Sequence, residues 1–588
     1  MSRSPGPVAR LLAVTLRPER RRVGAVVAVL VIALGLRLLT PALLGRFVDD
    51  AVARRPVSAL TKVAALYVAA ALTAELLQLA VMWGSVQISW NASNRLRERL
   101  ARHAVRLDMA WHGSHAPGQL IERIDGDVNA LGVFFANALV HVLGSVVLIL
   151  GMVAVSFAID LRAGALLLLS GGLGAYVLLR LRTAAVPARE AERQANAVLY
   201  GDLEERLGGL EDLRANGAGA YAVHRLHANS ARSWSTARRA ALLGDGSYAF
   251  AATTFAVGSV ATLALGFALR ARGLVSVGEV LALFRYSQML REPLERIAEQ
   301  LKEFQKALAG TRRAARLLAT EPAVADGPLD ASALPPGALA VELDGVTFRY
   351  DAASGPALRG VDLRLAPGTH LGVVGRTGSG KTTLGRLVVR LWDVQEGAVR
   401  VGGVDVRDLA LGALRSRVAV VTQDVELFRA SLRDNLTLFG ARPSPDDDLV
   451  AVLRQVGLGG WYAAQLEGLD TELRGGQSLS AGEAQLLAFA RAFLADPDVV
   501  VLDEASSRLD PTTEAYVMAA TRRLLAGRTA VVVAHRLATL DQVDEIAVVD
   551  AGEVVEHGPR DALAADPASR YARLLRASHD ARLAEEVS

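Results

Sequence analysis

A series of long apolar runs occupies the first half of this 588-residue sequence and limits what the chain can become. Five runs lie at residues 23–45, 63–86, 134–158, 163–180 and 247–269, and a weaker sixth lies at 276–291, where Arg285 interrupts it. A helix needs about 20 apolar residues to cross a bilayer core of roughly 30 Å. Together with a hydrophobic content of 52%, the runs predict a multi-pass membrane protein.

The charges around these runs predict their orientation. The basic residues before the first run are Arg3, Arg10, Arg17, Arg20, Arg21 and Arg22, against Glu19. Positive flanks remain in the cytoplasm, so we place the N-terminus there. The first run is too long for a signal-peptide core and other runs follow it, so we read it as a retained span.

Composition excludes several other functions. The chain has no cysteine, which rules out disulfides, thiolate catalysis and cysteine metal sites. A net charge of +4 gives no reason to propose nucleic acid as a partner.

The connections between the runs are unequal, and a linker follows them. The loops after the second and fourth runs are long and charged, at 94–106 and 188–239, which predicts helices that extend past the bilayer. Proline and glycine gather at 321–340, and short β-rich runs then alternate with helical ones. We therefore predict a transmembrane domain at 1–320, a linker at 321–340 and an α/β domain at 341–588.

A glycine-rich motif in the α/β domain predicts phosphate binding. Its residues are Gly375, Arg376, Thr377, Gly378, Ser379, Gly380, Lys381, Thr382 and Thr383. The glycines let backbone N–H groups converge on phosphate oxygens, Lys381 would reach the phosphates, and Thr382 would ligate Mg²⁺. The motif follows a predicted strand at 371–374 and opens a predicted helix at 383–391, whose N-terminus would face the anion.

A second motif supplies carboxylates. Residues 499–504 read as a buried parallel strand that ends in Asp503 and Glu504. Asp503 would hold Mg²⁺, and Glu504 would polarise the attacking water as a general base. An enzyme that hydrolyses a nucleotide is therefore predicted.

The order of further motifs makes the chain resemble exporter-type ABC transporters. The additional residues are Tyr350, Gln423, the run Leu479-Ser480-Ala481-Gly482-Glu483, the run Ser507-Arg508-Leu509-Asp510, and His535. The resemblance implies a six-helix membrane domain with long cytoplasmic helices, followed by a P-loop ATPase domain. It also implies two coupling regions, for which 111–128 and 205–217 are the candidates.

The resemblance assigns a role to each of these residues. Tyr350 would stack on adenine, Gln423 would sense Mg²⁺ and the attacking water, and His535 would contact the γ-phosphate. Ser480, Ala481, Gly482 and Glu483 form the signature, which contacts the ATP of a partner chain, and Asp510 belongs to the D-loop. Ala481, Glu483 and Arg508 depart from the usual pattern, but Ser480 and Gly482 remain, so we expect a working signature whose tuning Glu483 alters.

The function implied is transport driven by ATP, with ATP and Mg²⁺ as cofactors. Export of a lipid, drug or peptide is favoured over import of a siderophore-like substrate, and the apolar runs reject a soluble ABC ATPase of DNA repair or translation. The partner would be a second half-transporter, because each ATP needs the phosphate loop of one chain and the signature of another. A heterodimer is favoured over a homodimer, since residues 479–511 resemble the intact member of paired half-transporters from GC-rich bacteria. The expected location is among the lipids of a bacterial inner membrane, with a cytoplasmic ATPase domain.

Polar residues inside the runs are candidates for a substrate pathway. They are Glu75, Gln78, His141 and Arg285. Such residues are costly in a bilayer and face a cavity or a partner. A role in helix packing is an equally good explanation at this point.

Overall fold

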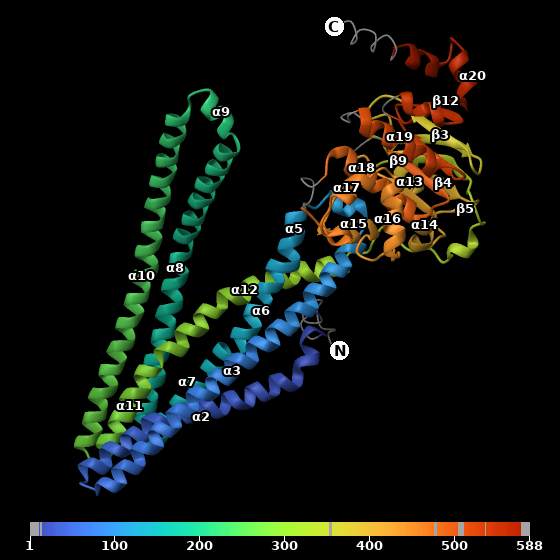
Figure 1. Ribbon diagram of the computed structural model, residues 1–588. Helices are drawn as coiled ribbons and strands as arrows, with labels where there is room; N and C mark the ends of the chain where they lie inside the picture. The colour runs from blue at the N-terminus through green and yellow to red at the C-terminus, as the bar shows by residue number, and fades with distance from the viewer. Residues whose placement is uncertain are drawn as a thin grey trace. The chain divides into compact units, whose positions relative to one another are not determined.

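The computed structural model describes residue 11 and residues 14–351, 355–474, 479–503, 511–534 and 537–577 (Figure 1). Contacts divide the chain into two compact units. The first comprises Met1–Val105 and Pro117–Thr320, and the second comprises Arg106–Ala116 and Glu321–Ser588.

The first unit consists of helices. They are α2 (Arg20–Val52), α3 (Val57–Arg106), α5 (Pro117–Ile121), η2 (Glu122–Gly126), α6 (Asp127–Asn137), η3 (Ala138–Leu143), α7 (Gly144–Ile159), α8 (Leu161–Gly208), α9 (Leu210–Ala215), α10 (Gly219–Ala271), α11 (Val277–Met289) and α12 (Arg291–Ala319), with η2 and η3 being π-helical turns. Helices α8 and α10 run side by side and are joined through α9 (Figure 1). The helices predicted to extend past the bilayer are therefore present.

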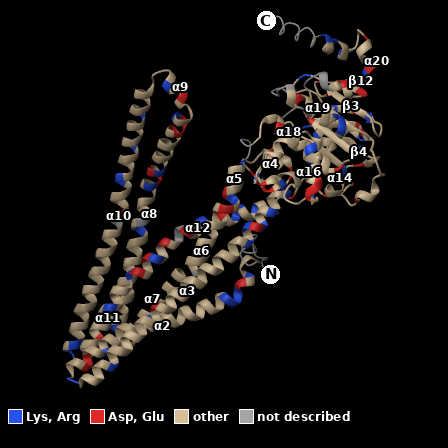
Figure 2. Ribbon diagram, viewed as in Figure 1, with Lys and Arg blue, Asp and Glu red and all other residues tan. Residues whose placement is uncertain are grey.

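Five helical stretches in the described residues are long and apolar enough to cross a membrane. They are Val14–Val52, Val57–Arg106, Pro117–Ile159, Leu161–Gly208 and Gly219–Ala271. Figure 2 shows long parts of α2, α3, α7 and α10 without charged residues, whereas α12 carries many. The first five predicted spans thus coincide with helices.

The sixth span differs from the prediction. Helix α11 has 13 residues, so it is only about 20 Å long and too short to cross a bilayer alone. Leu290 keeps helical backbone angles, and α12 begins at the next residue, so the helical path continues beyond residue 291. The charged residues that follow the sixth apolar run, beginning with Arg291 and Glu292, therefore lie on the same continuous helical path.

Close packing and local capping join these helices. Asp160 caps α8 by accepting hydrogen bonds from the N–H groups of Arg162 and Ala163. Gly45 of α2 and Gly278 of α11 touch, and a Cβ atom on either would collide with the backbone of the other. Glycine is required at this crossing because only it allows such an approach.

The second unit has an α/β architecture. A six-stranded sheet has the order β12-β11-β3-β10-β9-β6, a four-stranded antiparallel sheet has the order β2-β1-β4-β5, and β7 pairs with β8. The strands are β1 (Val341–Phe348), β2 (Leu358–Leu365), β3 (His370–Val374), β4 (Glu396–Val401), β5 (Val404–Asp405), β6 (Val418–Val421), β7 (Arg429–Ser431), β8 (Glu472–Arg474), β9 (Val499–Asp503), β10 (Thr529–Val533), β11 (Glu545–Asp550) and β12 (Glu553–Pro559). All pairs among β11, β3, β10, β9 and β6 are parallel, which brings their carboxyl ends to one edge.

Helices cover this sheet and enclose two apolar cores. They are α13 (Lys381–Val388), α14 (Leu411–Arg417), α15 (Leu432–Thr437), α16 (Asp446–Gln455), α17 (Gly459–Ala463), α18 (Ala481–Ala495), α19 (Pro511–Leu525) and α20 (Arg560–Ala565). The short helix α4 (Met109–Gly113), from earlier in the chain, also belongs to this unit. The predicted linker packs on this unit, since Gly327 donates to the carbonyl of Leu409 and Arg390 donates to that of Ala325. It is therefore not a free spacer.

Candidate nucleotide-binding site

The phosphate loop connects β3 to α13 along the carboxyl edge of the large sheet. Gly380 has φ of +111°, Gly378 has φ of +79°, and both lie in the left-handed region that favours glycine. A Cβ atom on Gly375 would collide with the carbonyl oxygen of Val549. The glycines of the motif are therefore demanded by the turn itself.

Lys381 lies within this loop and is 5% exposed. Its Nζ atom donates to the carbonyl oxygens of Gly375 at 2.8 Å and Arg376 at 2.9 Å. Burial lowers the pKa of Lys381, and the nearby Asp503 carboxylate opposes that shift. The ammonium is held inside the loop by these two carbonyl oxygens.

The two proposed metal ligands meet although they are far apart in sequence. Thr382 Oγ1 donates to Asp503 Oδ1 at 3.3 Å. Mg²⁺ prefers oxygen ligands and is commonly held by one or two protein oxygens together with substrate phosphates. Ser379 Oγ is buried and has no hydrogen-bond partner among the described residues, so the loop keeps an unsatisfied polar atom as well. These residues fit a metal-bound nucleotide.

An aromatic cluster lies beside the loop. The Tyr350 hydroxyl and Thr383 Oγ1 are 3.0 Å apart, and the Tyr350 and Trp392 ring centroids are 5.2 Å apart at an interplanar angle of 87°. Arg386 donates to the Tyr350 hydroxyl and lies over the Trp392 ring. Sequence reasoning found Tyr350 but missed Trp392 and Arg386, although both lie within 18 residues of the motif.

A cavity of about 870 Å³ joins these groups. Its lining includes Tyr350, Thr377, Gly378, Gly380, Lys381, Thr382, Thr383, Gln423, Asp503 and Arg491. Gln423 is exposed on the segment that follows β6. The structure thus brings together the loop, the aromatic residue, the strand carboxylate and Gln423.

Arg491 is a lining residue that sequence reasoning missed. It comes from α18 and donates to the backbone oxygens of Asn435 at 2.8 Å and Glu426 at 3.1 Å, and burial lowers its pKa. Asn435 is fully buried and donates to the carbonyl oxygens of Phe428 and Ser431. This polar network ties the signature helix to the segment after Gln423.

The signature residues begin α18 and form a reciprocal cap. Ser480 Oγ accepts from the N–H of Glu483 at 3.2 Å, and Glu483 Oε2 accepts from the N–H of Ser480 at 2.8 Å. This capping box satisfies two N–H groups at the helix start. Ala481 is exposed and Gly482 is buried in the first turn. The unusual Glu483 therefore has a structural role that its position relative to Ser480 could have revealed.

Some predicted residues lie outside the described part of the chain. These are Glu504, Arg508, Asp510 and His535. Glu504 directly follows Asp503, the last residue of β9.

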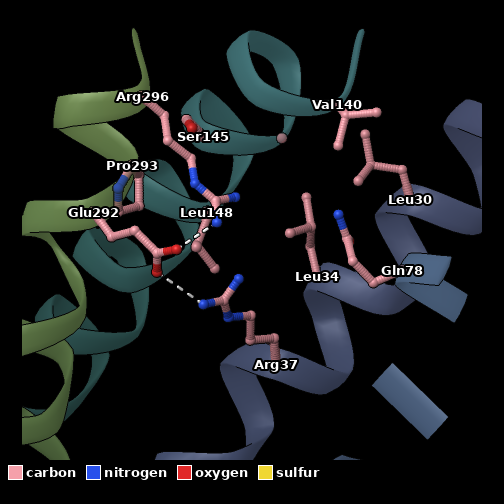
Figure 3. A pocket seen from close by; sticks show the side chains of 11 residues that line it. Leu30, Leu34, Arg37, Gln78, Val140, Ser145, Leu148, Glu292, Pro293 and Arg296 are labelled. Atoms are coloured by element: carbon pink, nitrogen blue, oxygen red, sulfur yellow. Dashed lines mark hydrogen bonds and ion pairs between the residues drawn. The ribbon is translucent and has the colours of Figure 1, made fainter. Parts of the chain in front are cut away.

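The four candidate pathway residues of the membrane unit separate into two groups. Glu75 and Arg285 are exposed on α3 and α11. Gln78 lines a small pocket, and His141 on η3 lies in the electrostatic field of Arg296, Glu299 and Glu292. Figure 3 shows that Arg37 and Arg296 converge on Glu292 in this pocket, and none of these three charges was singled out from the sequence.

Comparison with known proteins agrees with this arrangement. Residues 23–294 match the model of the ABC transporter transmembrane region, and residues 358–507 match the ABC transporter model. A multidrug efflux ATP-binding/permease protein of Mycobacterium tuberculosis is 32% identical over 559 residues, which cover 94% of this chain and 46% of that protein. This chain thus spans about half the length of that relative.

Two further relatives are matched over most of their length. A fatty acid ABC transporter ATP-binding/permease protein of Mycobacterium bovis is 30% identical over 519 residues, 87% of this chain and 80% of the relative. The cyclolysin secretion/processing ATP-binding protein CyaB of Bordetella pertussis is 30% identical over 563 residues, 95% of this chain and 77% of the relative. The chain therefore belongs to the ABC transporter family and joins the family's transmembrane region to its ATP-binding domain.

Proposed function

We propose that this chain is one half of an ATP-driven exporter. The observation that carries the proposal is the meeting of Lys381, Thr382 and Asp503 at one cavity, in a chain whose other unit consists of membrane-length helices. A phosphate loop beside a strand carboxylate is the arrangement by which P-loop enzymes hold a nucleotide and Mg²⁺.

The roles of the residues follow from their chemistry. Lys381 neutralises phosphate charge, while Thr382 and Asp503 hold Mg²⁺, which offsets the charge that develops during hydrolysis. Glu504 accepts the proton of the attacking water. Tyr350 offers its ring to the adenine, and Gln423 and His535 complete the site around the γ-phosphate.

A dimer is required by this mechanism. Family members function as dimers, and the N-terminus of α18, with Ser480 and Gly482, would meet the ATP held by a partner's phosphate loop. A helix N-terminus favours phosphate because its free N–H groups and its dipole attract anions. We favour a heterodimer, because one specialised interface tolerates Glu483 and Arg508 more easily than two identical interfaces.

Nucleotide binding closes this dimer, and hydrolysis loosens it. The membrane helices then alternate between inward-facing and outward-facing states. The ATPase unit and the N-terminus lie in the cytoplasm, in accord with the arginine-rich start of the chain. Relatives named for multidrug efflux and cyclolysin secretion support export. Together with a relative named as a fatty acid transporter, they support a lipid, drug or peptide as the substrate.

The test is reconstitution of the full-length chain in liposomes, alone and with a candidate partner half-transporter. We expect Mg²⁺-dependent ATP hydrolysis, and ATP-dependent accumulation of substrate in inside-out vesicles. Accumulation only in right-side-out vesicles would contradict export. A stable homodimer with full substrate-stimulated ATPase activity would contradict the heterodimer.

A further inference from the structure

The charged pocket of the membrane unit has no role in ATP hydrolysis. It is lined by Leu30, Leu34, Arg37, Gln78, Val140, Gly144, Ser145, Leu148, Glu292, Pro293 and Arg296. We propose that this pocket binds the anionic group of an amphipathic substrate, such as a long-chain carboxylate. This inference deepens the proposed transport function and rests on it.

The pocket lies near the middle of the membrane-length helix α2. Arg37 is 17 residues from the start of α2 and 15 from its end, which is about 26 Å and about 23 Å along the helix. Glu292 and Arg296, near the start of α12, reach this level because they pair with Arg37. Ionisable residues at such depth are expensive and mark substrate pathways or helix contacts.

The hydrogen-bonding capacity of the pocket favours an anion. Glu292 uses one oxygen for Arg37, at 3.0 Å, and the other for Arg296 (Figure 3). Among the described residues, each of these guanidinium groups makes no other hydrogen bond, so most of its five N–H donors are free. The Gln78 amide also has no partner there, and Figure 3 shows it across the pocket from the arginines. The free groups are mostly donors, which an incoming carboxylate can accept from.

The charge of the lining points the same way. Two arginines against one glutamate leave the lining with a net charge of +1. Arg37 and Arg296 have side chains that are each 36% exposed, and that of Glu292 is 50% exposed, so a ligand can reach them.

The volumes of two pockets suit different parts of an amphipathic ligand, the charged end and the apolar chain. The space of the charged pocket is about 20 Å³, which is room for about one water-sized group such as a carboxylate oxygen. An apolar cavity of about 790 Å³ is lined by residues of α12 and α7, two helices that also line the charged pocket. Ile297 and Ala298 of its lining directly follow Arg296, and Leu143 and Val146 flank the Gly144 and Ser145 of the charged pocket. Cavities of roughly 300–1,000 Å³ hold ligands of this class.

One polar atom inside the apolar cavity supports the presence of a ligand. Gln300 lies one helical turn beyond Arg296 and is 9% exposed. Its Oε1 atom is buried and has no partner in the described part of the chain. A buried acceptor of this kind is satisfied by a ligand or a water molecule.

The experiment measures binding of tritiated oleate to the full-length, nucleotide-free chain in phosphatidylcholine nanodiscs, with empty nanodiscs as background. Replacing one charged donor should weaken binding, so Arg37→Gln and Arg296→Gln are expected to lower oleate affinity roughly tenfold or more. Glu292→Gln removes the competing carboxylate and should raise the affinity. Ala298→Phe fills the apolar cavity and should weaken binding with the arginines intact.

The matched control is Arg46→Gln, an exposed arginine nine residues along α2 and on its opposite face, which should not change binding. Methyl oleate and oleylamine, which lack the carboxylate, should compete poorly. Unchanged affinity in folded Arg37→Gln and Arg296→Gln proteins, or equal competition by oleylamine, would overturn the proposal. If neither arginine variant folds, Glu292→Gln decides, and unchanged or weaker binding there rejects the site. Because the assay contains no nucleotide, loss of ATPase activity would refute the transport function without affecting this result.

Discussion

Replacing Glu483 with Gln should lower the ATP concentration needed for half-maximal hydrolysis. It should keep the capping hydrogen bonds at the start of α18. Glu483 Oε2 accepts the Ser480 N–H at 2.8 Å, and a glutamine oxygen can accept the same hydrogen bond. The substitution removes a negative charge from the first turn of α18, where the partner's ATP is proposed to bind. Two like unit charges about 4 Å apart in water repel each other by about 1 kcal/mol, so removing this charge should lower the ATP concentration for half-maximal hydrolysis by up to about fivefold.

The variant Glu483→Ala distinguishes the effect of the negative charge from the effect of the capping hydrogen bond. It removes the same charge, so it should shift the ATP dependence in the same direction. It also breaks half of the reciprocal cap, which should cost about 1 kcal/mol and lower the Tm of the ATPase domain by ~2–4 °C. Ser480→Ala should produce a similar loss of Tm, because it removes the other half of the cap.

The assays are ATP-dependent hydrolysis by the reconstituted transporter and calorimetric unfolding of the same samples. If Glu483→Gln leaves the ATP concentration for half-maximal hydrolysis unchanged or raises it, the carboxylate does not repel the nucleotide. A Glu483→Ala protein as stable as the parent would show that the capping box contributes nothing, and either result refutes this reasoning.

Three further outcomes are expected. Lys381→Ala should weaken ATP binding, measured with a fluorescent nucleotide, because the proposed role of the buried ammonium is to neutralise phosphate charge. Retained affinity together with retained transport would reject the phosphate-loop assignment. Glu504→Gln should keep ATP binding but lower hydrolysis ~10²–10⁴-fold, and near-normal turnover would exclude it as the general base. Asn435→Ala should lower the stability of the ATPase domain by about 1–3 kcal/mol, because buried carbonyl groups lose their donor, and calorimetry showing no change would contradict this.

The sequence alone was sufficient where the chemistry is local. The phosphate loop is contiguous, and its glycines, Lys381 and Thr382 could be identified from spacing. The strands before the loop and before Asp503 were correct because continuous apolar runs bounded by turn residues report buried parallel strands. The first five membrane helices follow from apolar length in the same way.

Tertiary structure decided what depends on contacts between distant segments. The predicted sixth apolar run ends at 291, yet the next residue, Glu292, lies against Arg37, 255 residues away in sequence. Periodicity cannot show that a charge on one helix faces a charge on another. Likewise the network of Asn435 and Arg491 spans 56 residues, and the linker's contact with Leu409 has no signal in its own composition.

The role of Glu483 depends partly on local sequence and partly on the tertiary structure. The pattern of Ser480 followed three residues later by glutamate is a local capping signal, but it was interpreted only as a departure from the family's signature. The structure shows that the carboxylate is used within its own chain. A side chain's hydrogen-bond partner depends on the fold around it, so the residue type alone could not decide between a structural and a nucleotide-directed role.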